Sequence, residues 1–239
     1  MSNRKLFLSG DIHGEWKELV WTLTVKYGIT EADVVVLGDF GIGFDNSMPG
    51  LYKRTEKRLE EADIVIHALR GNHDDPEFFN GEHDYPRLKF LKDSTVYTFC
   101  GDKKALILGG ACSTDITWRL KENQKLASKG KSTRVWWPGE DIKKTPIKDL
   151  PSRVDLILSH EAPLSFDPVL IRMTETPEYQ YEKIKDSRKY LEEVFNEVWC
   201  DRWYYGHYHN HYLGTTGRTS WRGLGIMEIV EVRFDNEVS

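Results

Sequence analysis

The placement of polar residues after strand-like segments constrains the fold of this chain more than any other feature. Five hydrophobic segments are each followed at once by Asp, His or Asn, at Asp11, Asp39, Asn72, His160 and His207. The first three, at 5–9, 33–37 and 64–69, alternate with segments of helical apolar spacing around 16–23 and 51–62. This βαβαβ order predicts an α/β fold with a mostly parallel sheet.

The carboxyl ends of parallel strands meet at one sheet edge, where ligands bind in open α/β folds. Asp-x-His and His-x-His spacings place both side chains of each pair on the same side of an extended segment. Carboxylate, imidazole and amide ligands suit Mn²⁺, Fe, Zn²⁺ or Ni²⁺. Seven side chains exceed what one tetrahedral site needs and suit two metals that share a carboxylate. They are Asp11, His13, Asp39, Asn72, His160, His207 and His209.

The second half predicts a hairpin of Val96–Phe99 and Ala105–Leu108, then strands at 154–159, 202–205 and 225–232 and a helix around 190–198. Residues 112–150 are polar and interrupted by prolines, and we interpret them as a long loop insertion. No repeat or low-complexity linker divides the chain. The expectation is therefore one domain over residues 1–239.

Composition excludes several classes of protein. Of 239 residues, 39% are hydrophobic and 12% aromatic, which excludes a disordered chain. The net charge of −5 argues against a general nucleic-acid binder, so nucleic acid is expected only as a possible substrate. Three cysteines without a CxxC pair argue against a disulfide framework and a structural zinc site, and favour the cytoplasm. No apolar stretch is long enough to predict a membrane span.

The five polar segments read, in order, GDIHG, GDFG, GNHD, SHEAP and GHYH. Together they resemble the calcineurin-like metallophosphoesterase superfamily, in a form similar to bacterial and phage members. The resemblance covers Leu6 to His209. It implies a four-layer αββα sandwich, in which two mixed sheets are flanked by helices.

The resemblance also implies roles for individual residues. Asp11, His13, Asp39 and His209 would ligate one metal, and Asp39 would bridge to a second that Asn72, His160 and His207 complete. His73 matches the catalytic histidine. Asp74 matches the acidic residue that follows it, which would hold the tautomer of the imidazole and raise its pKa. The cofactors would be two divalent ions, with Mn²⁺ preferred over Fe, Zn²⁺ or Ni²⁺, and hydroxide formed at the metals would attack the phosphoryl group.

The predicted activity is hydrolysis of a phosphomonoester, either a phosphoprotein or a nucleotide. Protein Ser/Thr phosphatases of this superfamily carry GDxxDRG, whereas residues 38–46 read GDFGIGFDN without an arginine. A phosphodiesterase acting on nucleotides or nucleic acid is therefore the alternative. A non-catalytic interaction module on the same fold is the distant alternative, because such modules lose ligands that this chain retains.

Basic and aromatic residues gather between Trp118 and Trp137, just after the strand Ala105–Leu108. Such residues hold a base or a phosphate in other proteins. We therefore expect this segment to cover the metal site, with Arg119 and Trp136 as substrate-binding residues. The alternative is a solvated loop whose tryptophans pack on the surface of the fold.

Overall fold

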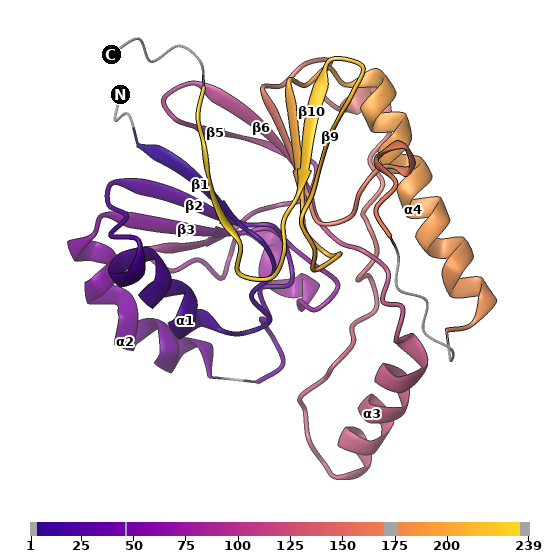
Figure 1. The fold of residues 1–239 in the computed structure, drawn as a ribbon. Helices are drawn as coiled ribbons and strands as arrows, with labels where there is room; N and C mark the ends of the chain where they lie inside the picture. Colours follow the sequence, from indigo (N-terminus) through magenta and orange to yellow (C-terminus); the bar gives the residue numbers. More distant parts are fainter. Residues whose placement is uncertain (1–3, 46, 170–175, 235–239) are drawn as a thin grey trace.

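The computed structural model describes residues 4–45, 47–169 and 176–234 and contains two mixed β-sheets (Figure 1). The order in the first sheet is β11 (Ile229–Val232), β1 (Lys5–Ser9), β2 (Ala32–Val36), β3 (Ile64–Ala68) and β4 (Leu88–Phe90). Strands β1 to β4 run parallel, and β11 pairs antiparallel with β1. The predicted parallel arrangement of the first three strands is confirmed.

The order in the second sheet is β5 (Thr95–Phe99), β6 (Lys103–Leu108), β7 (Leu156–Ser159), β8 (Arg202–Tyr205), β10 (Thr219–Gly223) and β9 (Tyr212–Thr216). The four central strands are parallel. The two edge strands, β5 and β9, pair antiparallel with their neighbours, as hairpins allow. The predicted hairpin of β5 and β6 is confirmed.

Helices cover the outer face of each sheet (Figure 1). The first sheet packs against α1 (Trp16–Trp21), which continues as a π-helical turn at Thr22–Lys26, and against α2 (Met48–Glu61). The second sheet packs against α4 (Glu178–Glu197). Short 3₁₀ turns lie at Pro76–Asn80, Ile147–Asp149 and Leu164–Phe166.

The alternating side chains of each strand explain the layers. In β2, Val34 and Val36 point to the helices, whereas Val35 and the following Leu37 point between the sheets. A third cluster joins α4 to the far face of the second sheet. Three apolar layers thus separate four layers of secondary structure, and the predicted αββα sandwich is confirmed.

The predicted long loop at residues 112–150 is wrong in one respect, because it contains α3 (Ile116–Ser128). The helix carries no apolar stripe, since Trp118 and Leu120 are exposed. Its buried residues are Ile116 and Arg119. Arg119 Nη1 donates to the carbonyl oxygen of Val135 over 2.7 Å, and Asn123 Oδ1 accepts from the N–H of Val135 over 2.8 Å. Hydrogen bonds to the returning chain therefore hold a helix that apolar spacing could not reveal.

Among the described residues, no helix is both long and apolar enough to cross a membrane.

Candidate metal centre

The carboxyl ends of five strands bring the predicted ligands together. Strand β1 leads to Asp11 and His13, β2 to Asp39, β3 to Asn72, β7 to His160, and β8 to His207 and His209. Two groups have ligand atoms that all lie within 4.8 Å of one another: Asp11, His13, Asp39 and His209 form one, and Asp39, His160 and His207 form the other. Asp39 belongs to both groups. The arrangement therefore fits two cations that share one carboxylate.

Imidazole and carboxylate atoms converge in the first group. The Nε2 atoms of His13 and His209 are 2.9 Å apart, and Asp11 Oδ2 lies 3.1 Å from His209 Nε2. Asp11 is fully buried, and its Oδ2 atom accepts no hydrogen bond from the described residues. A buried, unsatisfied carboxylate oxygen is costly unless a cation or donor compensates it. These donors thus fit a divalent metal ion.

In the second group, Asp39 Oδ1 lies 3.1 Å from His160 Nε2, and Asn72 Oδ1 lies 3.0 Å from the same nitrogen. Burial would raise the pKa of Asp39, but the imidazoles of His160 and His73 hold it well below its usual range. Burial would lower the pKa of His160, but Asp39 raises it to about 10. Asp39 is therefore a carboxylate at neutral pH, as a bridging ligand must be.

The backbone around the ligands is constrained. His13, Asp39, His207 and His209 all have φ between 45° and 69°, in the left-handed region that residues with a Cβ seldom adopt. A Cβ on Gly71 would lie 2.2 Å from Asp39 Oδ1, so only glycine lets the third strand end this close to the shared carboxylate. Strained backbone of this kind gathers at functional sites.

A chain of buried hydrogen bonds orients the amide of Asn72. Its Nδ2 donates to Ser113 Oγ over 3.0 Å, and Ser113 Oγ donates to Glu140 Oε2 over 2.6 Å. Glu140 also accepts from the N–H of Ser113 over 2.9 Å and is 2% exposed. With Nδ2 held in this way, Asn72 Oδ1 faces His160. Neither Ser113, in GGACSTD at 109–115, nor Glu140, in WWPGED at 136–141, was predicted from the sequence, because no motif or spacing links either residue to Asn72.

Glu161 is a further buried carboxylate that sequence reasoning missed, although it adjoins His160 in the SHEAP segment. One oxygen accepts hydrogen bonds from the N–H of Ala162 and from the hydroxyl of Tyr208. The other, Oε2, lies 3.8 Å from His207 Nε2 and has no hydrogen-bond partner among the described residues. It therefore places an oxygen without a hydrogen-bond partner beside the second group of ligands.

The predicted catalytic residue His73 lies beside the shared carboxylate, with Nε2 3.9 Å from Asp39 Oδ2. Arg119 Nη2 donates to the His73 ring, and Arg119 Nε is paired with Asp115 Oδ1 at 2.6 Å. Burial lowers the pKa of His73 to about 4, against the attraction of Asp39, and Arg119 adds to the lowering. The structure thus brings the predicted residue Arg119, on α3, to the predicted histidine.

The expected role of Asp74 is corrected by its hydrogen bonds. The carboxylate was expected to hold the His73 imidazole and raise its pKa. Instead its two oxygens accept four main-chain N–H groups over 2.7 to 3.1 Å, from Phe40, Gly41, Ile42 and Gly71. Asp74 therefore fixes the loop after β2, because its oxygens are already occupied by the backbone, and Arg119 contacts the imidazole in its place.

The indole nitrogen of Trp136 is buried beside Glu140, and the substrate-binding role expected of Trp136 stays a prediction. Its carbonyl oxygen accepts from Asn123 of α3 over 2.8 Å, and its side chain lines a hollow along that helix. The adjacent Trp137 instead turns toward the site, where its ring meets the ring of Phe44 at 5.1 Å in a T-shaped arrangement.

All five N–H groups of Arg70, which directly precedes the GNHD motif, donate to protein acceptors. Its Nε donates to Asp93 over 2.9 Å, and its four other N–H groups donate to main-chain oxygens of Gly109, Gly139, Glu140 and Asp141. A guanidinium has five donors. Arg70 therefore has none left for a phosphate and ties the strand end to the Glu140 segment.

Comparison with known proteins agrees with this geometry. The family model of calcineurin-like phosphoesterases matches residues 5–211. The chain belongs to this family. A calcineurin-like phosphoesterase is a metal-dependent phosphoric ester hydrolase, which is what the shared-carboxylate site fits. The search of curated proteins finds no match. A solved structure, the phosphopantetheinyl hydrolase of Mycobacterium tuberculosis, is similar with a TM-score of 0.47 and 11% identity over 100% of this chain and 99% of that one.

Proposed function

We propose that this calcineurin-like phosphoesterase hydrolyses a phosphomonoester with two divalent ions, most readily Mn²⁺. Asp11, His13, Asp39 and His209 would hold one ion, and Asp39, Asn72, His160 and His207 the other. When bound, such ions lower the pKa of water and offset the charge of the phosphoryl group.

The observation that carries the monoester proposal is the contact of Arg119 with His73 beside Asp39. Arg119 Nη1 donates to Val135 and has a second N–H for another acceptor. A monoester offers three non-bridging oxygens and two negative charges, whereas a diester offers two oxygens and one charge. A guanidinium beside the metal ligands favours the more highly charged group. His73 lies where its ring can hydrogen-bond the phosphoryl or leaving oxygen.

The experiment is a hydrolysis panel on metal-depleted protein with Mn²⁺ restored. We expect faster turnover of p-nitrophenyl phosphate than of bis-p-nitrophenyl phosphate, and loss of both in Asp39→Asn and His73→Ala. Asp102→Asn makes the same chemical change as Asp39→Asn on an exposed hairpin turn and should retain wild-type rates. Preference for the diester would support the alternative phosphodiesterase. Mn²⁺-independent turnover, or wild-type rates in Asp39→Asn, would contradict the proposal.

We also propose the cytoplasm as the location of the protein. Cys112 and Cys200 are buried thiols, and burial raises the pKa of Cys200 to about 11. Thiols of this kind suit a reducing compartment. Localisation of a tagged full-length chain by cell fractionation tests this proposal.

A further inference from the structure

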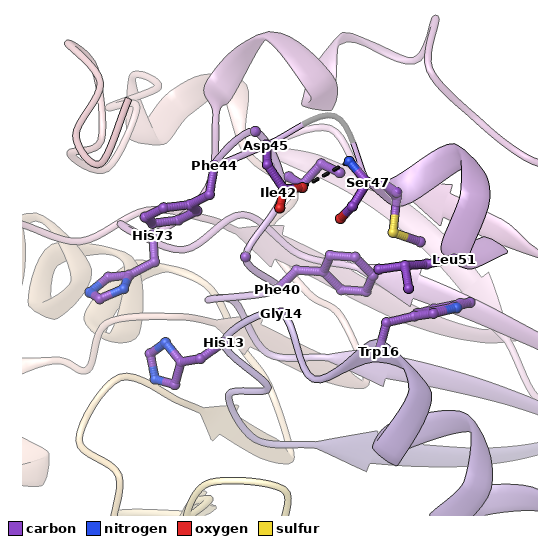
Figure 2. Close-up of a pocket in the computed structure, with 13 residues that line it drawn as sticks. His13, Gly14, Trp16, Phe40, Ile42, Phe44, Asp45, Ser47, Leu51 and His73 are labelled. Carbon is purple, nitrogen blue, oxygen red and sulfur yellow. Dashed lines mark hydrogen bonds between the residues drawn. The ribbon is translucent and has the colours of Figure 1, made fainter. Parts of the chain in front are cut away.

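A pocket opens beside the metal centre, between His13 and His73 and the loop after β2 (Figure 2). Its volume is about 310 Å³, at the lower end of the range for small-molecule sites. Asp45 and Ser47 are the other polar side chains of the lining, and the remaining side chains are apolar: Trp16, Phe40, Ile42, Phe44, Met48 and Leu51. The pocket therefore runs from groups that act on a phosphate to a wall that suits an apolar group.

Packing fixes the aromatic rings of this wall. Phe44 lies over His73, with ring centroids 6.3 Å apart (Figure 2). The ring of Trp137 packs against Phe44 at 5.1 Å. On the other side, the rings of Trp16 and Phe40 lie 5.8 Å apart, and both residues are buried. Rings that are already held in place bind a planar group with little loss of entropy.

The hydrogen bonds of Asp74 hold the main chain of the same wall. Asp74 accepts from the N–H groups of Phe40, Gly41 and Ile42, and the carbonyl oxygen of Ile42 accepts from Asp75 over 2.9 Å. The residue that follows His73 thus sets the position of the pocket relative to that histidine. The pocket is part of the same rigid unit as the metal centre.

The charge of the pocket restricts its occupant. Among the described residues that line it, none is Lys or Arg, and the charged side chain besides the histidines is Asp45. A hydrogen bond from Ser47 lowers the pKa of Asp45, so this residue is ionised at neutral pH. A second phosphate or a carboxylate on the substrate would find no counter-ion there and would be repelled by Asp45.

We propose that this pocket holds the leaving group of the substrate, and that the leaving group is an uncharged alcohol bearing an aromatic ring. The inference rests on the proposed monoesterase function. Hydrolysis breaks the P–O bond to that alcohol, forms a P–O bond to the oxygen of water, and delivers one proton of the water to the released hydroxyl. Pairs of aromatic rings add attraction beyond the burial of their area, so the half-buried Phe44 ring beside His73 favours a ring over an alkyl chain.

The test compares benzyl phosphate with methyl phosphate, whose leaving alcohols have similar acidity and differ in the ring. With Mn²⁺ restored, we expect kcat/KM to be at least about 10-fold higher for benzyl phosphate, mainly through KM. Equal kcat/KM for the two esters would overturn the inference while leaving the monoesterase function standing.

Binding of non-hydrolysable analogues separates this inference from the proposed function. Calorimetry should show benzylphosphonate binding at least about 10-fold more tightly than methylphosphonate, whether or not the esters are turned over. Equal affinities would overturn the inference. Tighter binding of benzylphosphonate without hydrolysis of either ester would support the pocket and contradict the proposed function.

Variants locate the effect in the pocket. Phe44→Leu keeps apolar volume but removes the ring, and Phe44→Ala removes both, so the benzyl preference should fall in that order. Leu213→Ala is the matched control, because Leu213 is 65% exposed on β9, and the wild-type preference should remain. An unchanged benzyl preference in folded Phe44→Ala would contradict the assignment of this pocket. Circular dichroism confirms folding.

Discussion

The side-chain amide of Asn72 donates to the hydroxyl of Ser113 over 3.0 Å, which places a residue of the 112–150 segment directly behind a proposed metal ligand. Mutation of a group that orients a metal ligand commonly lowers the metal affinity 10- to 100-fold. The segment thus contributes to the metal centre from behind, as well as through Arg119 from the side of His73.

Ser113→Ala should weaken Mn²⁺ binding by roughly 10-fold or more, because the Asn72 amide loses the acceptor that keeps Oδ1 toward His160. Isothermal titration calorimetry of metal-depleted protein measures the change. Ser187→Ala is the matched control, since Ser187 is also buried but its hydroxyl contacts Cys112. Equal Mn²⁺ affinity in Ser113→Ala and wild type would show that Asn72 needs no such support.

Glu140→Gln should change how stability depends on pH. Burial raises the pKa of Glu140 from 4.5 to about 7, although hydrogen bonds from Ser113 oppose the shift. The folded protein therefore holds this proton more tightly than the unfolded chain, so the contribution to stability is full below pH 4.5 and is lost as the pH rises through 7. Relative to Glu140→Gln, the unfolding free energy of wild type should increase by about 3 kcal/mol as the pH falls from 8 to 4.5. Urea denaturation with chelator present measures this free energy at each pH. Parallel pH profiles of the unfolding free energy in wild type and Glu140→Gln would contradict the prediction.

Arg119→Ala should lower kcat/KM on a phosphomonoester by about 10²-fold or more, as loss of a charged donor at a phosphoryl site does. Arg119→Lys should recover little of this, because one ammonium cannot contact Asp115, Val135 and His73 together. Lys125→Ala, on the exposed side of the same helix, should have wild-type kinetics. Steady-state rates over a range of substrate concentrations decide between these outcomes, and full activity in Arg119→Lys would show that charge alone matters.

Trp137→Ala should cost about 3 kcal/mol of unfolding free energy, since this side chain is 5% exposed and supports Phe44. Trp136→Ala, one residue away, should cost about 1 kcal/mol, because its ring is half-buried along α3. Urea denaturation compares the two variants. A larger loss of unfolding free energy in Trp136→Ala would contradict this ranking of the two side chains.

The strands and the ligands that follow them could be predicted because two strong signals coincide. Strand β1 has the predicted bounds Lys5–Ser9, and β8 has the predicted bounds Arg202–Tyr205. In each case a buried apolar run ends at a glycine and a metal-competent residue. Spacing of residues in the chain fixes which side chains share a face, and the sheet brings the strand ends together.

Helix α3 and the β9–β10 hairpin were not predicted from the sequence, each for its own reason. Beside Ile116, the inner face of α3 carries Arg119 and Asn123, whose partners at Val135 and Trp136 no periodicity reveals. The hairpin has a visible Thr-Gly-Arg turn, but its strands alternate weakly between exposed and half-buried positions. Contacts such as Ser113 with Asn72 join distant parts of the chain through single polar atoms, so only the folded arrangement shows them.

Asp74 holds the loop after β2 through the main-chain N–H groups of Phe40, Gly41 and Ile42, so the half-buried side chain of Phe44 plays no part in this hold. A chain built this way can exchange a lining residue such as Phe44 while the catalytic centre keeps its shape. The preference for a leaving group can then change without loss of the catalytic activity. A few substitutions in one short loop would suffice for this change.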